Sequence, residues 1–530
     1  MFLKIYDKVL EYVKNARGLV KKRPLLDKVI EALEANDSTV YLVSAPTGYG
    51  KTLISMSVSL HEFYQGFKTI VAYPLTSLIE EQVKIMKDLF RFHGLSGDLV
   101  GSRYMGSRES PYLIHPVTLT TIDTLSLTAL GLSPEDVRKV LKNLYEYWFS
   151  NLGHYLFSWS SVYSSTFLVL DEFHLMYDSS KSLNFLRALV DLCESFGVKI
   201  ILMSATLPKS FESLFSKLPK TGKIRFSKDE DPDFFGERAS KKYRIELHYF
   251  NAKDKLIRIL ELLTRSEFRK ALVVFNTVED AINFYRLLSS KEDATVEKIL
   301  IHSRFSAEDR ESKISKLEEL KKSGSKCVMV GTQSIEAGID ITSDLIISEI
   351  APPISLIQRF GRFLRYDEKE GKAHIWVEDN ELDSSAKYYK VYDKDLTKRT
   401  LDYLSSNSDV NLHISYDDLL NYVYYETPQI NESLISEFRS ILWELLEPSK
   451  SALKLLIKLE GSFVREGVNV TVTSEDGVDV NVSYDYLMSL KKRGLCRDCP
   501  KDEFDAVIRS LSGEKFRVYV KYDREVGLYG

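Results

Sequence analysis

Short apolar runs alternate with longer amphipathic segments between residues 40 and 206. The runs have the length and aliphatic composition of buried strands, and the segments between them have the length of helices. The strand candidates are residues 40–43, 69–73, 117–120, 167–170 and 198–203. Because strands and helices alternate, we predict a parallel sheet with crossover helices in a domain that spans residues 1–220.

The same alternation begins again after a polar, charged connector near residues 219–242. The second group of strand candidates comprises residues 271–275, 299–301, 327–330 and 345–347. We therefore predict a second α/β domain in tandem with the first, at residues 240–384.

The pattern changes after residue 385. Tyr-rich helical segments are followed by apolar helix candidates at residues 434–459. Two alternating runs, 468–473 and 478–482, flank Glu475-Asp476-Gly477, which has the composition of a hairpin turn. We predict a smaller α+β module at residues 385–530.

Residues 131–165 form an insertion of the first domain that is rich in aromatic residues. It contains Tyr145, Tyr147, Trp148, Phe149, Tyr155, Phe157 and Trp159. Such side chains can stack on nucleic-acid bases, or they can pack against helices. We favour packing, and contact of the insertion with nucleic acid stays open.

An octapeptide with the pattern of a phosphate-binding loop follows the first strand candidate and precedes a helical segment. It reads Ala45-Pro46-Thr47-Gly48-Tyr49-Gly50-Lys51-Thr52. Glycines let the backbone N–H groups point at phosphate oxygens, and the helix N-terminus adds its positive dipole end. Lys51 would contact the β- and γ-phosphates, and the Thr52 hydroxyl would bind Mg²⁺. We predict that these eight residues bind ATP.

The acidic pair Asp171-Glu172 directly follows the strand candidate at 167–170. The carboxyl ends of the strands of an open parallel sheet are where ligands bind. Asp171 can hold Mg²⁺ through water, and Glu172 can orient and deprotonate the water that attacks the γ-phosphate. We therefore predict Lys51, Asp171 and Glu172 as catalytic residues.

Further motifs indicate how the energy of the triphosphate is used. Ser204-Ala205-Thr206 follows the strand candidate at 198–203, and its hydroxyls can relay the state of the acidic pair. In the second domain, residues 330–341 and 358–365 contain two more motifs. Arg362 and Arg365 lie three residues apart on a helix, and we predict that they reach the γ-phosphate as arginine fingers in cis.

The order of these motifs resembles that of superfamily two helicases. More narrowly, residues 20–380 resemble the CRISPR-associated helicase of type I interference. The narrower resemblance depends on the Asp-Glu-x-His form at 171–174, motif IV at 275–278, His-Ser-Arg-Phe at 302–305, and motif V at 332–336 with Asp340.

The resemblance implies two tandem RecA-like P-loop domains with a smaller C-terminal domain. It also implies ATP-dependent, 3′ to 5′ movement along single-stranded DNA, and a type I guide-RNA effector complex as partner. By position, Pro74, Thr76, Thr121, Thr332 and Gln333 match motifs that touch the sugar-phosphate backbone. Such contacts position a strand without reading its sequence. Gly338 and Asp340 are added to the ATP site, and His174 and Gln358 join Ser204 and Thr206 as coupling residues.

Two departures from the family pattern affect the expected activity. Leu26 stands where family members often carry a glutamine that reads adenine, so selectivity for ATP over other triphosphates is open. Many relatives also begin with a histidine-aspartate nuclease domain, whereas none of the nine histidines here is followed by Asp. We therefore expect a helicase subunit that does not cut DNA and that works with a separate histidine-aspartate nuclease.

Composition indicates the compartment in which we expect the protein, but it does not identify the ligand. The formal charge of -4 gives no global basic field, so nucleic acid would have to bind in a local groove. Four cysteines argue against a disulfide framework and fit a reducing cytoplasm. We interpret Cys496 and Cys499 as two thiols near a turn and assign no zinc to them. Residues 147–170 lack Asp, Glu, Lys and Arg, but their six serines argue against a membrane span.

Two alternatives stay open. One is an RNA helicase or remodelling ATPase of the same superfamily. The other is a scaffold in which the triphosphate acts only as a conformational switch. The joint presence of Lys51, Asp171, Glu172, Arg362 and Arg365 argues against the scaffold, since a pure binder needs neither a base nor arginine fingers.

Overall fold

The computed structural model describes the chain except for residues 19–20, 105–106, 138–139, 141–153, 178, 217–219, 292–294, 337, 380, 383–385, 443–447, 466 and 512. The chain forms two compact units. The first comprises Met1–Asp231, Thr427–Val470 and Pro500–Lys515, and the second comprises Pro232–Glu426, Thr471–Cys499 and Phe516–Gly530. Each unit is described by itself.

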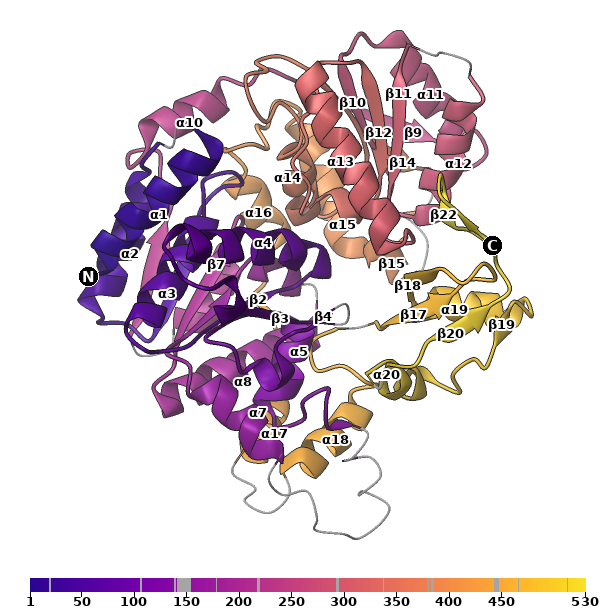
Figure 1. Cartoon of the computed structure of the whole chain (residues 1–530). Coiled ribbons are helices and arrows are strands. Elements are labelled where there is room, and N and C mark those ends of the chain that lie inside the picture. The colour runs from indigo at the N-terminus through magenta and orange to yellow at the C-terminus, as the bar shows by residue number, and fades with distance from the viewer. Residues whose placement is uncertain are drawn as a thin grey trace. The chain divides into compact units, whose positions relative to one another are not determined.

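The first unit is built on an eight-stranded sheet in the order β4-β3-β5-β2-β6-β7-β1-β8 (Figure 1). All neighbouring strands are parallel except β4, which is antiparallel to β3. The strands are β1 (Val40–Ser44), β2 (Thr69–Tyr73), β3 (Val100–Tyr104), β4 (Ser107–Arg108), β5 (Val117–Thr121), β6 (Phe167–Leu170), β7 (Lys199–Ser204) and β8 (Thr221–Arg225).

Helices connect these strands, as a parallel sheet requires. The helices of the first unit are α1 (Phe2–Arg17), α2 (Pro24–Ala35), α3 (Thr52–Tyr64), α4 (Thr76–Phe92), α5 (Ile122–Ala129), α7 (His154–Tyr163), α8 (Ser180–Phe196), α9 (Lys209–Ser216), α17 (Glu432–Ile441), α18 (Pro448–Lys458) and α20 (Glu503–Leu511). Although α17 is distant in sequence, it packs on α8, where Phe438 meets Phe185 edge to face. A late segment of the chain therefore belongs to the first unit.

The second unit is built on a six-stranded, all-parallel sheet in the order β11-β12-β10-β13-β14-β9. Its strands are β9 (Ile245–Phe250), β10 (Lys270–Val274), β11 (Glu297–Ile301), β12 (Cys327–Gly331), β13 (Leu345–Glu349) and β14 (Lys372–Glu378). Its helices are α10 (Pro232–Ala239), α11 (Lys255–Arg265), α12 (Val278–Ser289), α13 (Ala307–Ser323), α14 (Pro353–Phe360), α15 (Lys394–Ser406), α16 (Asp417–Val423) and α19 (Tyr484–Lys492).

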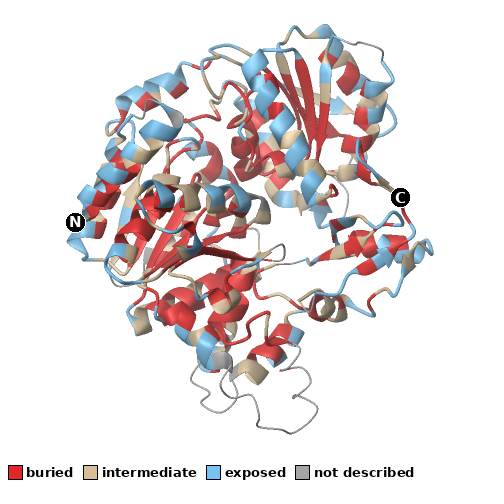
Figure 2. Cartoon of the chain, in the orientation of Figure 1, coloured by how far each residue is buried: buried red, intermediate tan, exposed pale blue. Residues whose placement is uncertain are grey.

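The central strands of both sheets are buried on their two faces. Figure 2 shows buried central strands and helices that expose one side only. β1, β2 and β12 are buried at every position, which explains why their sequences are continuous apolar runs instead of alternating ones. The predicted α/β fold with tandem parallel sheets is confirmed.

Small strands occupy the C-terminal region. β17 (Asn469–Thr473), β18 (Asp479–Ser483), β19 (Cys496–Arg497) and β20 (Phe516–Val518) form a four-stranded sheet in the order β18-β17-β20-β19. The predicted hairpin is present, because β17 and β18 are neighbours in this sheet. Gly477 has a φ of 84° in the turn between them. Two-stranded ribbons are formed by β15 (Tyr388–Tyr389) with β16 (Tyr392–Asp393), and by β21 (Tyr522–Asp523) with β22 (Gly527–Leu528).

Part of the aromatic insertion lies outside the described residues, including Tyr145, Tyr147, Trp148 and Phe149. At the described Trp159, the indole meets Phe196 edge to face with ring centroids 5.4 Å apart, which agrees with helix packing. The predicted boundaries of the three domains stay predictions. Within the part of the chain that the structure describes, no helix is long and apolar enough to cross a membrane.

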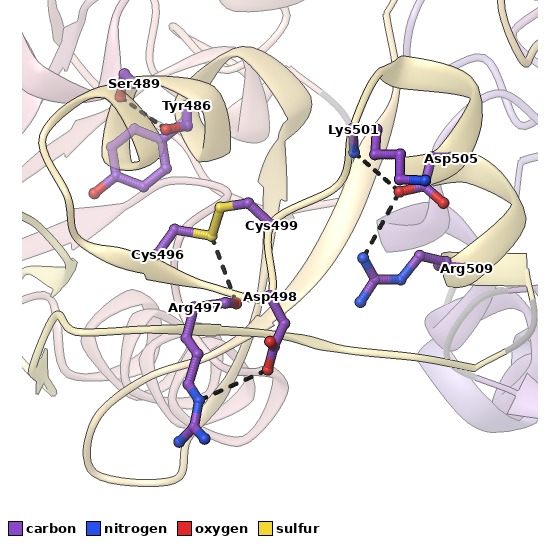
Figure 3. The surroundings of a disulfide bond; sticks show 9 residues. All are labelled: Tyr486, Ser489, Cys496, Arg497, Asp498, Cys499, Lys501, Asp505 and Arg509. Carbon is purple, nitrogen blue, oxygen red and sulfur yellow. Dashed lines mark hydrogen bonds and ion pairs between the residues drawn. A yellow bond between two sulfur atoms is a disulfide. The ribbon is translucent and has the colours of Figure 1, made fainter.

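The structure corrects the interpretation of Cys496 and Cys499 as two thiols. They form a disulfide whose Cα atoms lie 5.9 Å apart (Figure 3). Asp498 between them adopts a φ of 55°, and this local reversal brings the two residues within bonding range. Cys193 and Cys327 are buried free thiols.

Candidate functional site

The phosphate-loop motif lies between β1 and α3 of the first unit. Gly48 and Gly50 have φ angles of 78° and 100°, which side-chain-bearing residues rarely adopt. Lys51 is only 6% exposed, and its Nζ donates to the carbonyl of Ala45, 3.1 Å away. The lysine therefore folds back over the loop, at the N-terminus of α3, where an anion is stabilised by the helix dipole.

The acidic pair lies at the same edge of the sheet. β6 and β1 are separated only by β7, and Asp171 and Glu172 directly follow β6. Glu172 Oε1 lies 3.6 Å from Lys51 Nζ. The backbone N–H of Glu172 donates to Asp171 Oδ1 over 2.9 Å. The structure thus brings together the three residues predicted to be catalytic in the first domain.

Glu172 adopts a left-handed backbone conformation with a φ of 52°. For a residue other than glycine such a conformation costs about 1 kcal/mol or more, and strained residues of this kind cluster at functional sites. The strain at Glu172 turns its carboxylate toward the phosphate loop instead of continuing the direction of β6.

Burial controls the protonation of Asp171 and His174. Burial, reinforced by the Glu172 carboxylate and opposed by Lys51, raises the pKa of Asp171 to about 7. Burial also lowers the pKa of His174 to about 4, although the Glu172 carboxylate, 3.2 Å from its Nδ1, favours the charged form. At neutral pH the imidazole is therefore uncharged, and full ionisation of Asp171 needs a further cation.

A divalent cation fits this requirement. A carboxylate that is buried next to a second carboxylate is stabilised in its charged form by Mg²⁺. Asp171 and the hydroxyl of Thr52, the first residue of α3, are hard oxygen donors of the kind that Mg²⁺ prefers. The residues present thus fit the predicted Mg²⁺.

The Ser204-Ala205-Thr206 segment is bonded to the phosphate loop. The backbone N–H of Ala45 donates to the Ser204 carbonyl over 3.0 Å. The Ser204 hydroxyl accepts from the N–H of Thr206 over 3.0 Å and donates to the carbonyl of the same residue. A shift of this segment would therefore move the backbone at the start of the phosphate loop through the hydrogen bond between Ala45 and Ser204. The predicted coupling role stays a prediction.

Tyr49 has a role that the sequence did not reveal. Its buried hydroxyl donates to Asp231 Oδ2 over 3.0 Å and accepts from the N–H of Leu25 over 3.3 Å. Arg23 lies 3.6 Å from Asp231 and over the tyrosine ring. The loop is thereby fastened to the start of α2 and to Asp231. Leu26, which replaces the expected glutamine, is fully buried.

The predicted strand contacts of the first unit lie next to an unpredicted arginine. Pro74 is buried after β2, Thr76 begins α4, and Thr121 caps α5 by accepting from the Thr124 N–H. Arg465 Nη2 donates to the Pro74 carbonyl over 2.8 Å and lies 2.6 Å from Asp123 Oδ2. A residue 391 positions away thus fixes the loop that carries Pro74.

The predicted placement of Arg362 and Arg365 on a helix is wrong, because α14 ends at Phe360 and Leu364, between the two arginines, has a φ of 46°. Both arginines have partners on neighbouring loops of the second unit. Arg362 donates to the carbonyls of Ile335 and Glu336 over 3.2 and 3.0 Å. Arg365 Nε lies 3.4 Å from Asp340 Oδ1. Although burial opposes it, hydrogen bonds from Lys321 and Tyr366 lower the pKa of Asp340, so this carboxylate is charged.

The neighbouring Arg359 is the structural centre of this region, and the sequence did not single it out. It is completely buried. Its guanidinium donates to Glu336 Oε1, Asn276 Oδ1 and the Tyr392 hydroxyl over 2.9, 2.9 and 3.0 Å, and also to Ser348 and the Glu349 carbonyl. Arg359 therefore connects motif IV and motif V with its own motif at residues 358–365. The sequence feature that could have identified Arg359 is its place in the pattern Gln-Arg-x-Gly-Arg, one residue after Gln358.

The remaining predicted residues of the second unit lie close to this arginine. Gln333 Nε2 donates to the Asn276 carbonyl over 3.3 Å. Thr332 and Gln358 are buried, and Gly338 has a φ of 75°. None of these contacts tests the predicted roles, which stay predictions.

Two family models match the chain. The DEAD/DEAH box helicase model matches residues 23–214, and the model of the C-terminal part of the CRISPR-associated nuclease/helicase Cas3 matches residues 267–368. Each match contains motifs described above. The first contains the phosphate loop and the acidic pair, and the second contains Arg359 with its hydrogen-bond partners Asn276 and Glu336.

Curated relatives agree with these matches. The chain is 26% identical over 365 residues to a CRISPR-associated helicase Cas3 of Thermoproteus tenax, covering 66% of this chain and 57% of the relative. It is also 26% identical over 418 residues to a CRISPR-associated nuclease/helicase Cas3 of Methanothermobacter thermautotrophicus, covering 70% and 44%. The chain thus spans about half the length of these relatives.

A solved structure confirms the fold over nearly the whole chain. The crystal structure of T. fusca Cas3 with AMPPNP superimposes with a TM-score of 0.67, at 17% identity, covering 98% of this chain and 71% of that one. The predicted tandem RecA-like architecture with a C-terminal domain is therefore confirmed, and the matched families are those of ATP-hydrolysing helicases.

Proposed function

We propose that this chain, which belongs to the CRISPR-associated Cas3-type helicases of superfamily two, uses ATP hydrolysis to move 3′ to 5′ along single-stranded DNA. The observation that carries the proposal is the site on the first unit. There, buried Lys51, Asp171 and strained Glu172 converge at the carboxyl edge of a parallel sheet.

The residues of this site have distinct roles in the proposed reaction. The phosphate loop and Lys51 hold the β- and γ-phosphates of ATP. The carboxylate of Glu172 orients the attacking water by accepting a hydrogen bond from it, and then accepts its proton as the general base. Asp171 and Thr52 hold Mg²⁺, which supplies positive charge to the phosphate oxygens when bound.

Arg362 and Arg365 complete the proposed reaction as fingers from the second unit. Charge develops on the γ-phosphate during transfer, and an arginine supplied in cis stabilises it. For Arg365 to act in this way, its ion pair with Asp340 must exchange for one with phosphate. Such an exchange between two arrangements is how hydrolysis would be converted into a step along the strand.

DNA is the proposed substrate because of the helicase family and the positions of Pro74, Thr76, Thr121, Thr332 and Gln333. These residues would contact the backbone without reading sequence. The proposed partner is a type I guide-RNA effector complex. A structure called CRISPR RNA-guided surveillance complex, pre-nicking, contains a chain with this fold and supports the partnership (TM-score 0.61, 17% identity, covering 98% of this chain and 71% of that one).

We place DNA cleavage in a separate histidine-aspartate nuclease subunit. The observation that supports this proposal is that none of the nine histidines in the 530 residues is followed by aspartate. Incubation of the purified chain with single-stranded DNA and Mn²⁺ or Ni²⁺ tests this. Degradation that survives repurification would refute the division of labour.

Stimulation of the ATPase by nucleic acid tests the substrate. Hydrolysis is measured with no nucleic acid, with single-stranded DNA and with RNA of the same sequence, and unwinding is measured on duplexes with a 3′ or a 5′ tail. The proposal predicts stimulation by DNA and unwinding from the 3′ tail. A clear preference for RNA would instead support a remodelling RNA helicase.

A further inference from the structure

Three potential metal ligands lie together on the sheet of the second unit, on strands to which the proposed function assigns nothing. Glu246 and His248 are alternate residues of β9, so their side chains share one face of the sheet. β14 runs parallel to β9, and His374 on β14 is the register partner of Glu246. The pairing therefore places all three side chains on the same face.

The three ligand atoms are close enough to share one ion. His248 Nε2 lies 3.1 Å from His374 Nδ1. Glu246 Oε2 lies 3.3 Å from His374 Nδ1 and 4.0 Å from His248 Nε2. An ion at the centre of a triangle with these edges is about 2 Å from each atom, which is the usual bond length from zinc to nitrogen and oxygen.

We propose that Glu246, His248 and His374 bind a divalent transition-metal ion, with Zn²⁺ as the preferred ion. Two imidazoles and one carboxylate form the donor set of many zinc sites, in which water or another ligand takes the fourth position. Hard Mg²⁺ and Ca²⁺ prefer oxygen donors alone, so they compete poorly for two ring nitrogens.

The surroundings of the three residues favour metal binding. His374 is 5% exposed, whereas the Glu246 side chain is 62% exposed, so one side is held by the protein and the other is open to an incoming ion. The ring of Phe250 stacks on His248 with centroids 5.7 Å apart and restrains it.

Bound metal would join the two strands at one edge of the sheet. Among the strands that the structure describes, β9 pairs only with β14 and forms the edge of the sheet. β9 is also the first strand of the second unit, following α10. A zinc ion shared between β9 and β14 would therefore fasten the point at which the chain enters this sheet.

Metal content and affinity test the proposal. The full chain is stripped with a chelator, equilibrated with Zn²⁺ and analysed by elemental mass spectrometry, and Co²⁺ is titrated as a coloured substitute. The same measurements are made on H248A and E246Q, on H93A as a control that removes a histidine of the first unit, and on C496S/C499S, which removes the two disulfide-bonded cysteines.

The proposal predicts about one bound Zn²⁺ in the native chain, in H93A and in C496S/C499S. It predicts affinity weakened by more than about 100-fold in H248A, since even the loss of a residue that only orients a ligand costs 10- to 100-fold. Excess Zn²⁺ should raise the melting temperature of the native chain by about 5 °C and leave that of H248A unchanged. Native chain without zinc, or H248A with native affinity, would overturn the proposal.

Discussion

Replacing Asp171 with Asn is expected to stabilise the nucleotide-free protein while it abolishes ATP hydrolysis. Asp171 is 5% exposed and lies beside Glu172, so its ionised form is unfavourable in the folded state. Asn keeps the side-chain oxygen that accepts from the Glu172 N–H, but it carries no charge. The substitution therefore removes an electrostatic penalty together with the predicted Mg²⁺ ligand.

The size of the effect follows from the pKa of Asp171, which is raised from 3.8 to about 7. An acid whose folded pKa is raised stabilises the fold while protonated, so this contribution is complete below about pH 4 and is lost as the pH rises toward 7. A pKa difference of one between the folded and unfolded states corresponds to about 1.4 kcal/mol of stability. The native chain should therefore lose up to about 4 kcal/mol over this interval relative to D171N.

Thermal unfolding of both proteins between pH 5 and pH 8, without nucleotide or Mg²⁺, measures this difference. At pH 8 we expect D171N to melt about 5–10 °C above the native chain, and the gap should narrow toward pH 5. Mg²⁺ with a non-hydrolysable ATP analogue should raise the native melting temperature more than that of D171N. A gap that does not depend on pH would refute the argument.

Four further substitutions and one control separate structural from functional roles. Arg359→Ala leaves the buried Glu336 carboxylate without its cation and should lower the free energy of unfolding by about 3–5 kcal/mol. Arg362→Ala loses hydrogen bonds to two backbone carbonyls, so it should keep native stability and lose ATPase activity. Tyr49→Phe removes the bond that fastens the phosphate loop to Asp231; it should cost about 1–2 kcal/mol and raise KM for ATP more than it lowers kcat. Arg465→Ala should weaken DNA binding about tenfold with little change in basal ATPase, while the control Arg439→Ala, which removes a half-exposed arginine paired with Asp191, should change neither.

Each of these expectations has a clear contradiction. Equal melting temperatures for the Arg359 and Arg362 variants would remove the distinction between the buried arginine and the finger. Native KM in the Tyr49 variant would show that the loop holds its shape without the hydroxyl. Native DNA affinity in the Arg465 variant would show that the Pro74 loop needs no support from the late segment.

Most of the strands that the sequence predicted lie inside the two sheets, although the predicted β11 is an edge strand and the interior strand β14 was missed. β2 and β6 begin and end at the predicted residues because a strand covered on both faces is a continuous apolar run. The strands that were not identified include β3, β8, β9 and β14. β8 reads Thr-Gly-Lys-Ile-Arg and contains no fully buried position, so its pattern does not differ from that of a loop.

The candidate site likewise combines motifs of adjacent residues, which could be predicted, with contacts between residues far apart in the sequence, which could not. The phosphate loop and the acidic pair are contiguous motifs, so their residues could be named from the sequence. The bond from Tyr49 to Asp231 spans 182 positions, and that from Arg465 to Pro74 spans 391. No local pattern carries such pairs, because the order of strands and the return of the late segment to the first unit create them.

The central claim is that Glu172 activates water for ATP hydrolysis that is coupled to DNA. The most direct measurement is the rate of hydrolysis by Glu172→Gln with saturating single-stranded DNA, alongside its affinity for ATP. We predict a fall in turnover of about 100-fold or more, with ATP affinity within about threefold of native, because general-base catalysis is worth about 10²–10⁴ in rate and Gln preserves the shape of the site. Turnover equal to that of the native chain would contradict the account.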